Sequence, residues 1–138
     1  MDMHLTPSEA QLSKLMSLPL EAPLAVLNLF EFNERANYQR DDPEYGTAVA
    51  EISGEDAYQK YGALAGKVIQ DLGGRVVFST AADQVLIGHE DANWHVAAIM
   101  YFPSRGAFMQ MMTDPEFQKA SRHRKAALKR HYMMHLNG

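Results

Sequence analysis

Three polar side chains interrupt stretches of sequence that are otherwise apolar, and such residues are the first candidates for chemistry. The first is Asn28, which lies in the apolar run 24–32. A buried amide must find a hydrogen-bond partner or it destabilises the fold. Asn28 could therefore orient a substrate carbonyl as a catalytic residue, or it could bond to a neighbouring backbone group or loop.

The other two are His95 and Tyr101, in the apolar run 94–102. On a strand, side chains at even spacing point the same way, so both would share a face with Ala97 and Ile99. A histidine and a tyrosine that face one cavity could act as general base and oxyanion donor on an enolisable or phenolic substrate. We predict both as catalytic residues. The alternative is that each is a core or interface residue whose polar atoms are satisfied by neighbours.

Arg124 is the fourth predicted catalytic residue. It recurs at helical spacing with the apolar residues Phe117, Ala120 and Ala127, so it is predicted to point inward. An inward arginine could hold a carboxylate or an enolate, and its planar guanidinium would do so with two parallel hydrogen bonds.

Two further residues are predicted to bind a ligand. His123 precedes Arg124 in the cluster of positive charge at 122–130, and Tyr61 lies on the apolar face of a predicted helix, where its hydroxyl could reach a cavity rim. Two alternatives stay open for the charged cluster: a solvated helix face, or pairing with the acidic residues 41–44. The cluster comprises Arg122, His123, Arg124, Lys125, Lys129 and Arg130.

No metal or cofactor is predicted. If His131 and His135 lie on a strand they share a face, but at about 3.3 Å per residue they are roughly 13 Å apart, too far for one ion. On a helix the spacing would suit zinc, yet the sequence holds no His-Glu-x-x-His motif. We interpret both as surface or interface histidines. The chain has no cysteine, which excludes thiolate chemistry and is compatible with the reducing cytoplasm.

The elements that must position these residues follow from caps and periodicity. Thr6 as N-cap, Pro7 and Glu9 predict an accessory helix, which with its linker occupies residues 1–23. A single domain then covers residues 24–138. A capping signature at 53–56 begins a long helix that ends at 73–74, and Gly62 and Gly66 within it suggest close packing against a strand.

The order of elements after the first helix is predicted to be β-α-β-β-α-β. Strands are expected at 24–32, at 76–79 with 84–88 as one bulged strand, at 94–102 and at 131–136. A short helix begins at 103–104, and Asp114 caps the next one. This is an α+β, ferredoxin-like topology, a four-stranded antiparallel sheet with both helices on one face.

The second face of this sheet leads to a prediction about partners. The strands at 24–32 and 94–102 are apolar on both faces, whereas two helices cover only one face. We therefore predict a homodimer in which a partner's sheet covers the other face.

Several stretches together resemble an uncharacterised family of unknown function within the dimeric α/β-barrel superfamily. The resemblance implies a fold related to antibiotic-biosynthesis-type monooxygenases and a ligand site between sheet and helices, and it carries over no catalytic residue. The matching stretches are Leu27-Asn28-Leu29 with Phe32, Ala57-Tyr58 through Tyr61-Gly62, Gly73-Gly74-Arg75, Tyr101-Phe102-Pro103-Ser104, and Asp114-Pro115-Glu116-Phe117 with His123-Arg124.

We therefore expect a cofactor-independent enzyme, an isomerase, lyase or monooxygenase that abstracts a proton from a small apolar or aromatic substrate. The alternative is a non-catalytic dimeric protein that binds a small molecule or is purely structural. The net charge of −4 and the lack of a Lys/Arg-Gly-aromatic motif argue against nucleic acid. The N-terminus shows neither a signal peptide nor a membrane span, so a cytoplasmic protein is expected.

Overall fold

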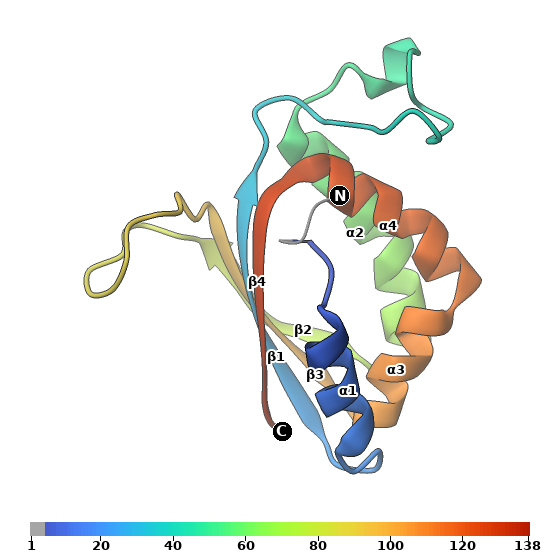
Figure 1. The fold of residues 1–138 in the computed structure, drawn as a ribbon, viewed down its shortest axis with the longest axis vertical. Coiled ribbons are helices and arrows are strands. Elements are labelled where there is room, and N and C mark those ends of the chain that lie inside the picture. Colours follow the sequence, from blue (N-terminus) through green and yellow to red (C-terminus); the bar gives the residue numbers. More distant parts are fainter. Residues whose placement is uncertain (1–4) are drawn as a thin grey trace.

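Four antiparallel strands form one sheet in the order β2-β3-β1-β4, and helices α2 and α4 cover one of its faces (Figure 1). The computed structural model describes residues 5–138, so the first four residues, on which the signal-peptide prediction partly rests, lie outside it. This is the predicted ferredoxin-like α+β fold. In chain order the elements are α1 (Glu9–Ser17), β1 (Leu24–Phe32), the 3-10 turn η1 (Ala48–Ala50), α2 (Gly54–Asp71), β2 (Arg75–Ala81), β3 (Val96–Phe102), α3 (Arg105–Thr113), α4 (Pro115–Ala127) and β4 (Leu128–Asn137).

Side-chain caps begin the helices. Ser53 accepts a hydrogen bond from the Asp56 amide at the start of α2, and Asp114 accepts from two amides at the start of α4, as predicted. The N-cap of α1 is Ser8 and not Thr6. The Ser8 hydroxyl and the Gln11 side chain satisfy each other's backbone amides, so the capping box forms two residues later than predicted.

The strand predicted at 84–88 is wrong. β2 ends at Ala81, where it pairs with Val96, and residues 82–95 form an arm that projects beyond the sheet (Figure 1). Leu86 and Ile87 in this arm are 82% and 91% exposed, so their apolar character reflects no pairing within this chain. The bulge of β2 lies instead between Val76 and Phe78.

Glycines of α2 differ in what surrounds them. At Gly54 a Cβ atom would lie 2.1 Å from the carbonyl oxygen of Asn33 and 2.6 Å from that of Ala127, so only glycine fits. Gly62 and Gly66 are exposed, and a Cβ there would meet no atom within 4 Å. The prediction that these two allow close packing against a strand is therefore wrong, because they lie on the solvent side of the helix.

Alternate residues of β1 face the helices and join two apolar clusters. One cluster contains Val26 and Phe102 packed against α2 and α3, and the other contains Phe30 and Leu128. Asn28 lies between Val26 and Phe30 on the same face of β1, and it is 2% exposed. An amide thus separates the two halves of the core.

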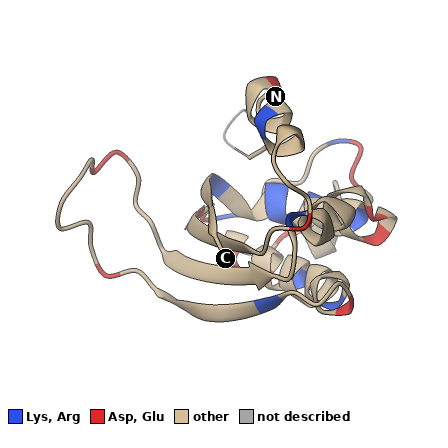
Figure 2. Cartoon of the chain, turned by 90° about the horizontal axis from the view of Figure 1, so that it is seen from below, with Lys and Arg blue, Asp and Glu red and all other residues tan. Residues whose placement is uncertain are grey.

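The opposite face of the sheet has no helix over it (Figure 1). Apolar side chains of β1, β3 and β4 point to this face. Leu27 of β1 lies between Ile99 of β3 and Met134 of β4 in the sheet register, and Tyr132 and Met134 are 45% and 42% exposed. Most charged residues are on the helices and loops, and the strands carry few (Figure 2). We refer to this surface of β1, β3 and β4 as the open sheet face. No helix of the described chain has the length and apolarity needed to span a bilayer.

Candidate functional site

A hydrogen-bonded chain of three side chains joins β1, β4 and α4. The guanidinium of Arg124 donates through Nη1 to Nδ1 of His131 over 3.1 Å, and Nε2 of His131 lies 2.8 Å from Oδ1 of Asn28. Arginine can only donate, so Nδ1 must be bare and the imidazole proton must be on Nε2. His131 therefore donates to Asn28, and Nδ2 of Asn28 has no hydrogen-bond partner among the described residues.

The junction of α4 and β4 brings these groups together. α4 ends at Ala127 and β4 begins at Leu128 without a connecting loop, which places Arg124 in the last helical turn and His131 early in the strand. The register of β1 and β4 sets His131 directly opposite Phe30, with ring centroids 4.8 Å apart. His131 thus faces the helices, next to Asn28 two residues earlier on β1.

Two tyrosines of α2 complete this group. The ring of Tyr58 lies 4.8 Å from Phe30 and 5.3 Å from Tyr61, measured between centroids. The ring of Tyr61 in turn contacts Phe117 of α4 at 6.0 Å. We call Asn28, Tyr58, Tyr61, Arg124 and His131 the interior polar cluster.

Burial and the charge of Arg124 set the protonation states in the interior polar cluster. Burial, and then the positive charge of Arg124, lower the pKa of His131 from 6.5 to about 3. Burial raises the pKa of Tyr58 and of Tyr61, and Arg124 opposes this rise in both. At neutral pH the cluster thus holds one cation, a neutral imidazole and two neutral phenols.

The interior polar cluster is only partly shielded. Asn28 is buried, whereas Tyr58, Tyr61, Arg124 and His131 are each half-buried, so solvent contacts four of its five members. Met133 lies opposite Asn28 in the register, on the edge strand β4, and is 44% exposed. The edge of β4 is therefore the direction in which the cluster approaches solvent.

The structure does not bring His95 and Tyr101 to this cluster or to each other. His95 accepts a hydrogen bond at Nδ1 from the Phe32 amide over 2.9 Å, and its ring stacks on that of Phe32. Tyr101 lies opposite Ala25 on the open sheet face, beside Arg75. Six residues of strand separate the two side chains by about 20 Å.

His123 lies in a different cluster, which holds the loop at 33–53 against α4. Its Nδ1 is 2.6 Å from the Tyr38 hydroxyl, and its Nε2 is 4.0 Å from Glu44. Arg122 donates to both oxygens of Glu44, at 2.9 and 2.8 Å. Of the two alternatives left open for the positive cluster at 122–130, pairing with the acidic residues 41–44 is therefore the one found, and it occurs within one chain. We call Tyr38, Glu44, Arg122 and His123 the loop latch.

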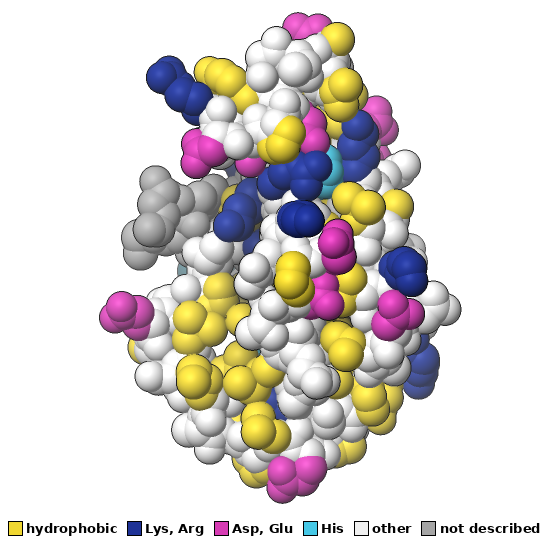
Figure 3. All heavy atoms as spheres, turned by 90° about the vertical axis from the view of Figure 1, so that its right-hand side faces the viewer, with side chains coloured by type: hydrophobic (Ala, Val, Ile, Leu, Met, Phe, Trp, Pro, Cys, Tyr) yellow, Lys and Arg dark blue, Asp and Glu magenta, His cyan; other side chains and the backbone are white. Residues whose placement is uncertain are grey.

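Arg122 and Glu44 stabilise each other's charged forms in the loop latch, whereas Arg122 disfavours protonation of His123. The hydrogen bonds of Arg122 lower the pKa of Glu44, and burial followed by the charge of Arg122 lowers the pKa of His123. Burial raises the pKa of Tyr38. On the helical side of the molecule, positive and acidic side chains lie close together (Figure 3). The latch has the features of a structural tie, since its polar atoms are engaged with one another.

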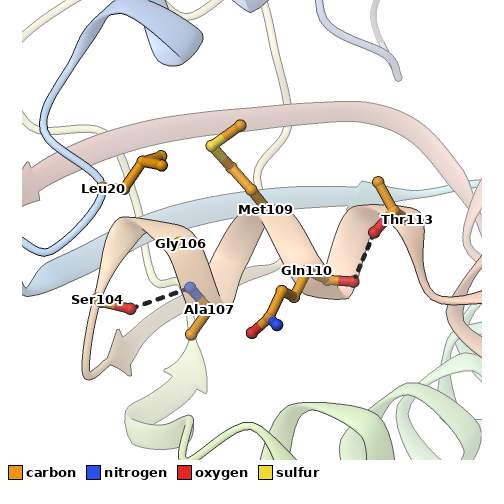
Figure 4. A pocket seen from close by; sticks show the side chains of 7 residues that line it. All are labelled: Leu20, Ser104, Gly106, Ala107, Met109, Gln110 and Thr113. Atoms are coloured by element: carbon orange, nitrogen blue, oxygen red, sulfur yellow. Dashed lines mark hydrogen bonds between the residues drawn. The ribbon is translucent and has the colours of Figure 1, made fainter.

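Two hollows on the surface lie away from the predicted site. One, of about 510 Å³, lies along α3, and the other, of about 460 Å³, lies within the 33–53 loop. Along the first, the Ser104 hydroxyl accepts from the Ala107 amide and the Thr113 hydroxyl donates to the Gln110 carbonyl, so α3 itself engages both hydroxyls (Figure 4). Neither hollow is lined by a residue of the interior polar cluster.

Besides Tyr58, His131 is the member of the cluster that the sequence did not predict as a site residue. His131 lies between Arg130 and Tyr132 in the sequence. No alternation of apolar and polar residues there predicts that its side chain points towards the helices. Only its pairing with Phe30 reveals its direction.

Residues 5–138 contain no group of three His, Cys, Asp or Glu residues that could hold a metal ion. The ring of His135 packs on Phe108.

A four-stranded antiparallel sheet with helices on one face and polar groups beneath them defines a ferredoxin-like α+β protein with an interior candidate site. Within that class, the chain belongs to the family described as "Domain of unknown function (DUF1330)", whose model matches residues 43–136. This confirms the resemblance seen in the sequence.

Solved structures agree with this assignment. The RPA0582 protein of Rhodopseudomonas palustris, described as a protein of unknown function, is 32% identical with a TM-score of 0.85, over 98% of this chain and 96% of that chain. SnoaB, a cofactor-independent oxygenase from Streptomyces nogalater, is 12% identical with a TM-score of 0.51, over 85% of this chain and 93% of that chain. The hydroxynitrile lyase of Passiflora edulis is 8% identical with a TM-score of 0.52, over 86% and 94%. These last two show the fold alone. A comparison with curated proteins found no match.

Proposed function

We propose that this protein is a cofactor-independent enzyme that transfers a proton on a small apolar or aromatic substrate at the interior polar cluster. The observation that carries the proposal is the hydrogen-bonded chain from Arg124 through His131 to Asn28, set between two halves of an apolar core. Asn28 and Arg124 are thus retained as catalytic candidates and Tyr61 as a ligand-binding one, and His131 is added.

The chain supplies the two functions that such a reaction needs. Arg124 is a permanent cation, and a cation in a partly water-excluded site stabilises the enolate or phenolate that proton removal creates. The free amide N–H group of Asn28 can donate to a carbonyl oxygen of the substrate. Rings of Phe30, Tyr58 and Tyr61 offer an apolar wall for the body of the substrate.

The proposed step moves one proton. The guanidinium of Arg124 turns from His131 to the substrate, the substrate C–H or O–H bond breaks, the proton goes to Nδ1 of His131, and the electron pair stays on the substrate as an anion. Loss of the neighbouring positive charge raises the pKa of His131, which makes it a better base at that moment. Return of the proton to another carbon gives isomerisation, and cleavage of a carbon–carbon bond gives a lyase. In a monooxygenase the substrate anion passes one electron to dioxygen, the resulting radical pair joins through a new C–O bond as a hydroperoxide, and the hydroperoxide loses water to leave a carbonyl.

Two neighbours in fold perform reactions of this range, one as a cofactor-independent oxygenase and one as a hydroxynitrile lyase. At 12% and 8% identity they support only the capacity of the fold for such chemistry.

We further propose that the protein acts as a homodimer in the cytoplasm, with the open sheet face as the interface. This face is apolar, half-exposed and without a helix, and the exposed arm at 82–95 lies at its border. A patch of this kind is typical of an association surface.

The second candidate function is binding of a small molecule without catalysis. One observation favours it: both nitrogens of His131 are engaged, and a pKa of about 3 makes the imidazole a weak base while Arg124 remains beside it.

The test is a screen of enolisable aromatic ketones and phenols for exchange of a carbon-bound proton with deuterated solvent, run with and without oxygen and with a chelator present. We expect exchange that Arg124→Met abolishes and that Lys125→Met leaves unchanged, because Lys125 is an exposed cation one residue along the same helix. His95→Ala should also retain exchange, given its place at the end of the sheet. Binding of screen compounds without exchange or turnover would favour the second candidate.

A further inference from the structure

The interior polar cluster contains a cation that nothing in the described chain neutralises. Arg122 is paired with Glu44 at 2.8 Å, and Arg130 lies 3.6 Å from Glu31. Arg124, by contrast, has no carboxylate oxygen of residues 5–138 within 4.0 Å, and its side-chain partner is the neutral His131. A half-buried cation without a counter-ion costs free energy that an anion would offset.

An unsatisfied hydrogen-bond donor lies two side chains away from this cation. Asn28 is 2% exposed and Nδ2 has no hydrogen-bond partner among residues 5–138. Its orientation is fixed, because Oδ1 must accept from His131 for Nδ1 of that ring to accept from Arg124. One cation without a counter-ion and one amide donor without an acceptor therefore lie in the same interior cluster.

A row of aromatic rings lies within and beside the same cluster. Phe30, Tyr58 and Tyr61 follow one another at centroid distances of 4.8 and 5.3 Å, and Phe117 extends the row. A planar or ring-sized apolar body would pack well against such a wall.

We infer that the interior polar cluster binds a small carboxylate with an aromatic or similarly apolar body, its carboxylate on Arg124 and a second acceptor group towards Asn28. The planar guanidinium matches a carboxylate through two parallel hydrogen bonds. A phosphate dianion fits less well, because Arg124 lies in the last turn of α4, where the helix dipole disfavours additional negative charge. The inference rests on the proposed location of the function but not on catalysis.

Calorimetric titration of the wild-type protein at pH 7 tests this with four probes: benzoate, benzoylformate, benzamide and inorganic phosphate. We expect benzoate to bind at least ten-fold more tightly than benzamide, benzoylformate to bind more tightly still, and phosphate to bind most weakly. Equal affinity for benzamide and benzoate, or a preference for phosphate, would overturn the inference, and neither result depends on any variant folding.

Variants then locate the site. Arg124→Met should remove the preference for benzoate over benzamide, whereas Lys125→Met should retain it. If the Arg124→Met protein does not fold, Arg124→Lys replaces it. Arg124→Lys should weaken benzoate binding while keeping the preference over benzamide. A preference that survives Arg124→Met would contradict the assignment. Carboxylate binding without turnover of any enolisable compound would sink the proposed function and leave this inference standing, whereas turnover of neutral ketones without carboxylate binding would do the reverse.

Discussion

Arg124 donates a hydrogen bond to Nδ1 of His131 over 3.1 Å, so a permanent cation lies against the bare nitrogen of a half-buried imidazole. The contact fixes the tautomer of His131 and, through it, the orientation of the Asn28 amide. Burial lowers the pKa of His131, and the charge of Arg124 adds to this effect, so that the pKa falls to about 3. One contact thus determines both the donors and the charge of the interior polar cluster.

This low pKa makes the free energy of unfolding depend on pH. Between about pH 3 and 6.5 the unfolded chain takes up a proton at His131 that the folded chain excludes. The contribution of His131 to the free energy of unfolding is therefore fully present above pH 6.5 and is lost as the pH falls towards 3. His131 alone changes the free energy of unfolding by up to about 1.4 kcal/mol per pH unit in this range. His131→Gln, which stays neutral, should flatten the profile in urea unfolding measured from pH 4 to 7. Parallel profiles for the two proteins would contradict the low pKa.

The loop latch should hold the 33–53 segment to α4. Glu44→Gln removes the charge that Arg122 binds through two hydrogen bonds, and we expect a loss of about 1–2 kcal/mol because the pair is largely buried. Trypsin should then cut faster after Arg40. Asp71→Asn is the matched control, because the pair of Asp71 with Lys67 is highly exposed and should contribute less than about 0.5 kcal/mol. Equal cleavage rates in the two variants would show that the latch does not restrain the loop.

Glycines of α2 provide a paired test of the packing. Gly54→Ala places a Cβ 2.1 Å from the Asn33 carbonyl oxygen, so we expect a loss of at least about 2 kcal/mol. Gly62→Ala meets no atom within 4 Å and should stabilise the helix by about 0.5–1 kcal/mol. Thermal unfolding of both variants measures these opposite shifts. A destabilised Gly62→Ala protein would mean that this side of α2 is not open to solvent.

The proposed dimer depends on the open sheet face. Wild-type protein should elute as a dimer at micromolar concentration in gel filtration with light scattering, and Ile99→Lys should give a monomer, because a lysine at the centre of the face would be buried without a partner. Leu64→Lys, at an exposed position of α2, should leave the dimer intact. A monomeric wild-type protein would rule out the dimer.

The sequence predicted the fold more completely than the site, and the reasons are physical. Helix caps at Ser53 and Asp114 and the apolar run of β1 are local signals, and the structure confirms them. The inward place of His131 depends on the strand register and on the absence of a loop after α4, which no local pattern encodes. Residues 84–88 show the converse error, since apolar residues in an exposed arm imitate a strand.

Asn28 was predictable as a candidate because it interrupts the apolar run of its strand. Arg124 was predictable because it recurs at helical spacing with the apolar residues of its helix. His95 and Tyr101 satisfied the same kind of pattern, yet His95 lies just before the start of the central strand β3, bonded to the Phe32 amide, and Tyr101 lies on the open sheet face. Alternation along a strand indicates a shared direction, but it does not indicate which of the two faces carries the helices.

The most direct test of the interior polar cluster as the functional site is the NMR titration of His131 with and without benzoate. In the free protein the ring signal should titrate near pH 3, and bound benzoate should raise the pKa by at least about one unit, because it neutralises Arg124. An unchanged titration of His131 in a protein that demonstrably binds benzoate would contradict the account.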